Sequence, residues 1–320
     1  MRVLVRNPNS GDRATSKRAA TLAEKRGFDV RDSTARGETR TLAAEAAREP
    51  DVTQIAACGG DGTLNEVVRG VADADALDDV ELGVVPAGTG NDFADNLGVR
   101  GVEHAFEVLA RGERRRLDLG WVAGDERPFV NSCVGGLTAE SSRKTSPAAK
   151  KRLGVLAYVL RTLAETRTFE GLELDVRAGA DDDASSGSDP SRERGDRLWT
   201  GTALMVLVGN GRRFPGERMR QANMEDGLLN VVVIERAPTI DYLARGAADR
   251  LLRRGASHLT RLKVPRLDVR HAGDPATFSL DGETLSRTDI TLRSRPGAMR
   301  FRVGEGYDPA PEEWGKSKGN

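Results

Sequence analysis

The sequence lacks several features that would assign it to particular classes of protein. Lys plus Arg and Asp plus Glu each number 49 among 320 residues, so no net charge attracts the protein to nucleic acid. Aromatic residues make up only 4% of the chain, and there are 13 prolines. We therefore expect no nucleic-acid partner, no aromatic surface for stacking bases and no β-propeller.

Cysteine and histidine are also scarce. The two cysteines, Cys58 and Cys133, lie far apart in apolar segments. This pattern favours two reduced thiols in the core of a cytoplasmic protein. The three histidines, His104, His258 and His271, are scattered, so we expect no zinc site.

Long hydrophobic runs are absent. Apolar runs such as 203–208 and 231–234 fall far short of the roughly 20 residues that cross a bilayer as a helix. The sequence begins Met1-Arg2-Val3 without the apolar segment of a signal peptide. We expect a cytoplasmic protein whose only membrane contact is transient and peripheral, at the inner membrane face.

The P-loop sequence Gly-x-x-x-x-Gly-Lys-[Ser/Thr] is missing, and a different glycine-rich turn is present at 59–62. An apolar run at 55–58 precedes this turn, and Leu64, Val67, Val68 and Val71 follow it at the spacing of one helical stripe. The pattern predicts a buried strand, a sharp turn and a helix. Amides that converge at a helix N-terminus favour an anion such as phosphate.

Asp61 stands inside this turn, where its carboxylate would repel phosphate. A divalent cation between the carboxylate and the phosphates would resolve the conflict, as in nucleotide-dependent phosphoryl transfer. The alternative is an ordinary turn between a strand and a helix, with Thr63 as a capping residue.

Strands and helices alternate over the first 120 residues. We predict strands at 3–5, 28–31, 55–58 and 81–85, and helices at 14–26 and 39–48. Alternation of this kind indicates a doubly wound α/β domain with a parallel sheet, here at 1–120. Its right-handed crossovers bring the loops after the strands to one edge, where 7–11, the region of Thr34, 59–63 and 88–92 should meet.

Residues 121–304 are predicted to form a second, antiparallel β domain. The expected strands are 127–134, 172–176, 198–208, 228–234, 262–269, 277–280, 290–292 and 299–303, the last of which could return to either domain. Helical patterns occur at 137–145, 153–168 and 239–252. The polar insert 179–196 and the tail 305–320 are expected to be disordered.

Eight short motifs occur in one order along nearly the whole chain. They are Asn7-Pro8-Asn9-Ser10-Gly11, Gly59-Gly60-Asp61-Gly62-Thr63-Leu64-Asn65-Glu66, Pro86-Ala87-Gly88-Thr89-Gly90-Asn91-Asp92-Phe93-Ala94, Leu117-Asp118-Leu119-Gly120, Phe129-Val130-Asn131 before Gly136, Gly209-Asn210-Gly211, Asp226-Gly227-Leu228-Leu229 and Asp281-Gly282-Glu283. In this order they resemble the diacylglycerol kinase catalytic family, in its bacterial and archaeal lipid kinase branch. That branch is similar to sphingosine and ceramide kinases and, more distantly, to NAD kinases and phosphofructokinases.

The resemblance implies an α/β nucleotide domain and a C-terminal β-sandwich, with the active site between them. It also implies that ATP is a cofactor. The residues that would bind ATP are Asn7, Pro8, Asn9, Ser10, Gly11, Thr34, Gly59, Gly60, Asp61, Gly62, Thr63, Leu64, Asn65, Gly88, Thr89, Asn91 and Asp92.

Magnesium is the second implied cofactor. Asp61 is the first choice for the carboxylate that organises Mg²⁺ through water, and Asp92 and Asp118 are second choices. The alternatives are a helix N-cap for Asp92 and a salt bridge for Asp118. A structural Mg²⁺ site is implied at Asp226, with Asn223 and Leu228 beside it, against the alternative of a turn before a strand.

The resemblance assigns Glu283 as the general base that takes the proton of the acceptor hydroxyl. Asp281 would support the metal or orient Glu283. Without the resemblance, Asp281-Gly282 reads as a hairpin turn. The basic residues between 143 and 152 are interpreted either as a lipid-headgroup edge or as a solvated surface.

The function expected from these residues is an ATP-dependent lipid kinase that phosphorylates a hydroxyl of a diacylglycerol-like or related lipid alcohol. The alternatives are a kinase for a soluble acceptor such as NAD and a non-catalytic regulator that binds nucleotide or lipid. Neither the particular lipid nor the oligomeric state can be read from the sequence, and a homo-oligomer stays open.

Overall fold

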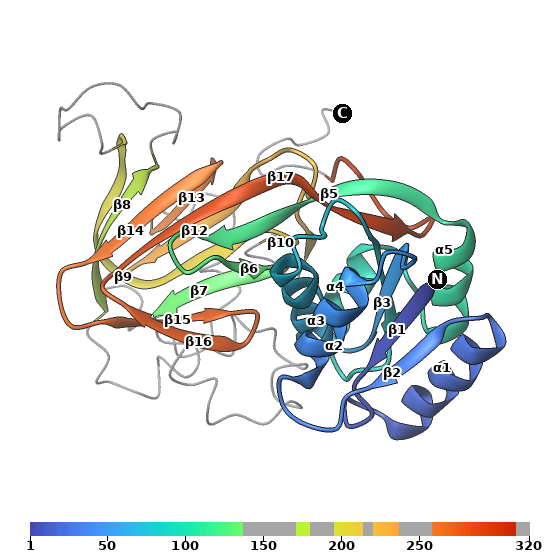
Figure 1. The fold of residues 1–320 in the computed structure, drawn as a ribbon. Helices are drawn as coiled ribbons and strands as arrows, with labels where there is room; N and C mark the ends of the chain where they lie inside the picture. The colour runs from blue at the N-terminus through green and yellow to red at the C-terminus, as the bar shows by residue number, and fades with distance from the viewer. Residues whose placement is uncertain (137–170, 180–194, 214–219, 237–257, 312–320) are drawn as a thin grey trace, which may run out of the picture. The chain divides into compact units, whose positions relative to one another are not determined.

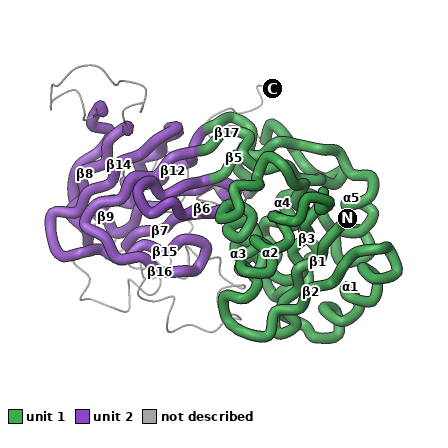
Figure 2. Tube along the Cα trace, viewed as in Figure 1, with its two compact units in different colours: residues 1–119, 221–227, 295–320 green, residues 120–220, 228–294 purple. Residues whose placement is uncertain are grey.

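The computed structural model describes residues 1–136, 171–179, 195–213, 220–236 and 258–311. The chain divides into two compact units, coloured green and purple in Figure 2. Unit 1 contains 1–119, 221–227 and 295–320, and unit 2 contains 120–220 and 228–294. Unit 1 thus includes two later segments that the sequence-based division near residue 120 assigns to the second domain.

Unit 1 is built on a parallel sheet (Figure 1). Its strands are β1 (Arg2–Arg6), β2 (Asp29–Asp32), β3 (Gln54–Gly59) and β4 (Glu81–Pro86), in the order β2-β1-β3-β4. β17 (Asp289–Val303) adds a further parallel strand beside β4, with Phe301 opposite Leu82. The last strand of the chain therefore returns to the first unit, one of the two possibilities that the sequence left open.

Five helices accompany this sheet: α1 (Arg13–Lys25), α2 (Glu38–Arg48), α3 (Asp61–Asp73), α4 (Asp92–Asn96) and α5 (Val102–Arg111). α1 begins at Asp12, whose carboxylate accepts hydrogen bonds from the amides of Ala14 and Thr15. α2 packs on α3, and α1 packs on α5. Every residue of β3 and β4 is buried, as expected for parallel strands covered on both faces.

Unit 2 is an antiparallel β-sandwich-like domain. Its strands are the end of β5 (Glu113–Val122), β6 (Arg127–Phe129), β7 (Ser132–Gly136), β8 (Leu172–Ala178), β9 (Arg197–Gly209), β10 (Arg212–Arg213), the start of β11 (Arg220–Gln221), β12 (Leu229–Glu235), β13 (Leu259–Val264), β14 (Arg266–His271), β15 (Ala276–Leu280), β16 (Glu283–Arg287) and the start of β17. Alternate residues of these strands form one apolar core, which includes Val176, Val208, Val231, Val269 and Phe278. The predicted fold class, doubly wound α/β followed by a β-sandwich-like domain, is confirmed.

Four predicted strands are divided or joined in the structure. The segment 127–134 contains two strands, β6 (Arg127–Phe129) and β7 (Ser132–Gly136). The segment 262–269 forms two strands, β13 and β14, because Pro265 lies between them and has no N–H for a ladder. The segments 290–292 and 299–303 belong to one strand, β17, which continues through Pro296 and Gly297. No described helix is long and apolar enough to cross a membrane.

Several predictions concern residues outside the described ranges. They are the helices at 137–145, 153–168 and 239–252, most of the insert 179–196 and the basic residues between 143 and 152. The predicted disordered tail is partly described, and its first residues make specific contacts. The side chain of Tyr307 donates a hydrogen bond to Glu225, and Gln221 donates one to the carbonyl of Asp308.

Candidate active site

Three loops meet in unit 1 after β1, β3 and β4. Glycines in these loops lie backbone to backbone: a Cβ on Gly88 would stand 2.4 Å from the Cα of Gly60, and one on Gly60 would stand 2.8 Å from the carbonyl oxygen of Gly90. Gly11 has a φ of +71°, and its Cβ would stand 2.2 Å from the carbonyl oxygen of Ala87. Only glycine allows this close approach.

Hydrogen bonds also connect these loops. The amide of Gly60 donates to Ser10 Oγ at 3.2 Å, and the amide of Ala87 donates to the carbonyl of Gly59 at 3.0 Å. The amide of Asn9 donates to Asn7 Oδ1 at 3.0 Å and shapes the first loop. The structure therefore brings together the predicted residues of 7–11, 59–65 and 88–92, which is three of the four loops expected at this edge.

The fourth loop, at Thr34, is used differently. The Thr34 hydroxyl donates a hydrogen bond to Glu38 Oε2 at 2.8 Å, and the amide of Ala35 donates one to the same oxygen at 2.9 Å. The hydrogen bond from the Thr34 amide has the largest effect on the pKa of Glu38, and together with the other two donors it lowers that pKa. Glu38, the first residue of α2, thus holds the loop at Thr34, and the place of Thr34 in the nucleotide site stays a prediction.

The start of α3 has no side-chain cap, and the amide of Asp61 donates to the carbonyl of Gly90 at 3.4 Å. The N-cap of α3 is Gly60, without a side-chain hydrogen bond, so Thr63 is not the capping residue that the alternative interpretation assumed. The Thr63 hydroxyl instead lies against Gly59. Gly62 is exposed, with open space around the position of a Cβ. Asn65 is buried, and its Oδ1 has no hydrogen-bond partner. Backbone amides at a helix N-terminus without a side-chain cap are typical of an anion site, whereas Asn65 Oδ1 is an acceptor and suits a donor group instead.

Asp61 joins the starts of two helices. Its Oδ1 accepts a hydrogen bond from the amide of Phe93 at 2.9 Å, and its Oδ2 accepts one from the amide of Asp92 at 3.1 Å. Asp92 is the first residue of α4 rather than its N-cap, which is Asn91. Asn91 holds the preceding turn through two hydrogen bonds with the backbone of Gly88, at 3.0 and 3.1 Å.

The remaining predicted nucleotide residues differ in exposure. Leu64 is buried, so only its backbone could meet a ligand, whereas Thr89 is exposed and Pro8 is half-buried.

Asp118 anchors two segments of unit 1 to β5. Its Oδ2 accepts a hydrogen bond from the amide of Gly227 at 2.7 Å, and its Oδ1 accepts one from the amide of Gly297 at 2.8 Å. Both glycines have positive φ, of +72° and +58°. Burial raises the pKa of Asp118 against the effect of these two donors, and the nearby carboxylates of Asp226 and Glu225 raise it further.

The predicted structural metal site lies in segment 221–227. Asn223 Oδ1 accepts a hydrogen bond from the amide of Glu225 at 3.0 Å, which forms a turn that also contains Asp226. Leu228 follows as the first residue of the next segment of unit 2. Sequence reasoning missed how this turn is fixed: the Glu225 carboxylate receives Arg115 at 2.7 Å and the Tyr307 hydroxyl at 2.7 Å.

Asp281 forms the turn between β15 and β16 in unit 2. Asp281 and Gly282 have φ values of +47° and +97°, and Leu280 pairs with Glu283 across the turn. The hairpin reading of Asp281-Gly282 is therefore correct as local structure. The carboxylate also accepts hydrogen bonds from the amides of Val130 at 2.6 Å, Asn131 at 3.0 Å and Ser132 at 2.8 Å.

Asp281 therefore fixes the hairpin that carries Glu283. Burial raises the pKa of Asp281 to about 6, against the three backbone amides that favour its ionised form. Glu283 is the first residue of β16, its side chain is 38% exposed, and it forms an ion pair with Arg127. No sequence pattern pointed to Arg127.

The two predicted metal sites centre on the carboxylates of Asp61 and Asp226. Within the described ranges, no three His, Cys, Asp or Glu side chains form a group that could hold a metal ion. A Mg²⁺ ion at Asp61 or Asp226 would thus need water or backbone carbonyl oxygens as further ligands. Mg²⁺ commonly keeps several waters, so the carboxylates fit an ion bound largely through water.

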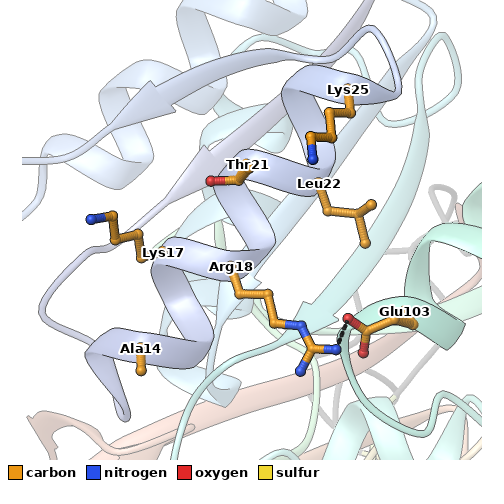
Figure 3. A pocket seen from close by; sticks show the side chains of 7 residues that line it. All are labelled: Ala14, Lys17, Arg18, Thr21, Leu22, Lys25 and Glu103. Carbon is orange, nitrogen blue, oxygen red and sulfur yellow. Dashed lines mark ion pairs between the residues drawn. The ribbon is translucent and has the colours of Figure 1, made fainter.

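A surface pocket of about 500 Å³ lies between α1 and α5 (Figure 3). Its lining includes Lys17, Lys25 and the ion pair between Arg18 and Glu103, with 2.6 Å between nitrogen and oxygen. None of the predicted site residues lines this pocket. We therefore assign it no part in the candidate active site.

The α/β unit with its glycine-lined loops and the β-sandwich-like unit each match the model of a known family. Residues 2–122 match the diacylglycerol kinase catalytic domain, and residues 131–303 match the YegS C-terminal NAD kinase beta sandwich-like domain. The chain therefore belongs to the diacylglycerol kinase-like family that includes the probable lipid kinase YegS.

Curated relatives agree with this assignment. The chain is 28% identical over 311 residues to "Probable lipid kinase YegS" of Escherichia coli O6:K15:H31 (strain 536 / UPEC), covering 94% of this chain and 95% of the relative. The same figures hold for the protein of that name from Escherichia coli O1:K1 / APEC.

Solved structures show the same fold. Two crystal structures from Bacillus anthracis str. Sterne match with TM-scores of 0.74 and 0.68. The first is named "a putative diacylglycerol kinase" and the second "a diacylglycerol kinases". They are 21% and 18% identical to this chain. Each comparison covers 96% of this chain, with 96% and 97% of the respective crystal structures.

Proposed function

We propose that this protein is an ATP- and Mg²⁺-dependent lipid kinase that transfers the γ-phosphate of ATP to a hydroxyl of a diacylglycerol-like or related lipid alcohol. One observation carries the proposal: the close packing of Gly11, Gly60 and Gly88 beside the start of α3, which has no side-chain cap. Family membership supports the choice of a lipid as the acceptor.

The nucleotide phosphates would lie against the backbone amides at the start of α3. A helix N-terminus attracts negative charge, and glycine leaves the amides accessible. The unpartnered Oδ1 of Asn65 suits a ligand hydroxyl or a bound water. The loops at 7–11 and 88–92 would complete this site, and Thr34 would join it only by leaving Glu38.

Magnesium would neutralise charge on the phosphates during transfer. Asp61 is the residue that would hold it, through water, because both carboxylate oxygens already accept backbone hydrogen bonds. Asp92 and Asp118 remain second choices. Asn223, Asp226 and Leu228 would hold a separate structural ion with carboxylate and carbonyl oxygens.

Glu283 would act as the general base. Its carboxylate takes the proton of the acceptor hydroxyl, whose oxygen forms a bond to the γ-phosphorus as the bond to the β-phosphate oxygen breaks and ADP leaves. Asp281 would orient Glu283, since its own carboxylate is held by three backbone amides. A lipid acceptor resides in a bilayer, so the protein would contact the inner membrane face transiently.

An acceptor competition tests the proposal. The full chain is incubated with Mg²⁺, γ-labelled ATP, a total lipid extract and NAD, and label is counted in the organic and aqueous phases. We expect label in the organic phase, its loss in Glu283→Gln, and normal transfer in Glu107→Gln, a control at an exposed helix position. Transfer to NAD would establish the soluble-acceptor alternative. ATP binding without transfer to any acceptor would indicate a regulator.

A further inference from the structure

We infer that Arg127 is a positioning residue for Glu283. The inference rests on the proposed function, in which Glu283 is the general base. Arg127 Nη2 donates a hydrogen bond to Glu283 Oε2, and the two side chains form an ion pair within unit 2. The side chain of Arg127 is 18% exposed and that of Glu283 is 38% exposed. The cation is thus the more enclosed partner, and the carboxylate is the one that an acceptor can reach.

The backbone around Arg127 is firmly held. β5 and β6 form a hairpin in which Val122 pairs with Arg127 and Gly120 pairs with Phe129. Phe129 is completely buried in the core of unit 2. A Cβ on Gly120 would stand 2.3 Å from the Phe129 ring, so the ring lies directly on the opposite strand. Arg127 therefore projects from a rigid base.

The side chain of Glu283 needs such a partner. Its backbone is fixed by the turn at Asp281, but among the described strands β16 is the last in the order β16-β15-β7 and pairs with β15 alone. A glutamate side chain has several rotatable bonds and samples several rotamers when nothing restrains it. The guanidinium of Arg127 selects the rotamers that keep the carboxylate beside β6.

This restraint matters for proton transfer. A general base must lie within hydrogen-bond reach of the proton that it takes, and a displacement of about 1 Å can lower the rate about 100-fold. Loss of Arg127 should therefore lower kcat by about 10- to 100-fold. The KM for ATP should not change, since the nucleotide site is built from other residues.

The chain offers a matched control in Arg287. Its Nη2 lies 2.9 and 3.0 Å from the two carboxylate oxygens of Asp125, in the turn between β5 and β6. This ion pair also ties β16 to the β5–β6 hairpin, but it does not involve Glu283. Substitution of Arg287 thus removes a tie of the same kind between the same elements.

The test compares Arg127→Gln, Arg127→Lys and Arg287→Gln in full-length protein, by kcat, KM for ATP and thermal unfolding. We expect a 10- to 100-fold fall in kcat for Arg127→Gln, at least partial recovery for Arg127→Lys, which keeps a cationic donor, and kcat close to wild type for Arg287→Gln. In a Glu283→Gln background, Arg127→Gln should cause no further loss, because Arg127 acts through Glu283.

Three results would overturn the inference while leaving the proposed function intact: wild-type kcat in Arg127→Gln, equal losses in the two Arg→Gln variants, or a raised KM for ATP with unchanged kcat. The last would place Arg127 at the nucleotide. A wild-type protein that transfers no phosphate would instead refute the proposed function, and this inference with it.

Discussion

Asp281→Asn perturbs the anchor of the hairpin that carries Glu283. The carboxylate accepts hydrogen bonds from three consecutive amides, those of Val130, Asn131 and Ser132. An asparagine side chain offers one oxygen, and its NH₂ group would face a backbone donor. At least one buried amide would lose its acceptor, which costs about 1–3 kcal/mol. We expect the variant to be less stable than wild type by this amount at pH 7.

The size of this difference should depend on pH. Burial raises the pKa of Asp281 to about 6 from an ordinary value of 3.8, so the folded protein binds this proton more tightly than the unfolded chain. The resulting stability is fully present below the ordinary value and is lost as the pH rises through about 6. Between pH 7 and pH 5 the wild type should gain on the order of 1 kcal/mol on this account, whereas the asparagine side chain of the variant cannot titrate.

Urea unfolding at pH 8, 7 and 5 measures this difference. Fluorescence is a suitable signal, because the described tryptophans, Trp121 and Trp199, both belong to unit 2. The stability deficit of Asp281→Asn should be nearly equal at pH 8 and pH 7 and larger by about 1 kcal/mol at pH 5. A deficit that shrinks from pH 7 to pH 5 would show that the three amides outweigh burial, and would refute the reasoning.

Three further predictions concern unit 1. Gly88→Ala should destabilise the protein by about 1–3 kcal/mol and abolish ATP binding measured by calorimetry, because its Cβ would meet the Cα of Gly60 at 2.4 Å. Gly62→Ala is the matched control: the position has open space, so its free energy of unfolding should stay within about 1 kcal/mol of wild type. Asp118→Asn should cost about 1–3 kcal/mol in urea unfolding by removing the acceptor of the Gly227 or Gly297 amide, and unchanged stability would contradict its anchoring role. Tyr307→Phe should lower the free energy of unfolding by about 1.5–3 kcal/mol in urea, since it removes a hydrogen bond to the Glu225 carboxylate. If the tail were disordered, this substitution would leave the stability unchanged.

The sequence was most informative where local patterns carry the structure. Short apolar runs predicted the parallel strands of unit 1. The shared edge of such a sheet predicted that the loops at 7–11, 59–63 and 88–92 meet, together with the region of Thr34, which contacts Glu38 instead. Asp281-Gly282 predicted the turn between β15 and β16. In each case short stretches of sequence, or a general rule of α/β topology, contain the needed information.

Contacts between distant segments could not be predicted in this way. Asp118 receives amides from Gly227 and Gly297, and Tyr307 reaches Glu225 from a segment that reads as a polar tail. Arg127 meets Glu283 across 156 positions of sequence. Ion pairs and carboxylate anchors of this kind leave no periodicity, so only the three-dimensional structure reveals them.

The most direct test of the proposed function is the chemical identity of the product. Full-length protein, Mg²⁺, ATP and diacylglycerol in mixed micelles would be analysed by mass spectrometry of the extracted lipid. The account predicts a lipid that is heavier by one phosphoryl group, formed by wild type and absent with Glu283→Gln or with EDTA. An unchanged lipid fraction, accompanied by a phosphorylated water-soluble acceptor when one is supplied, would contradict it.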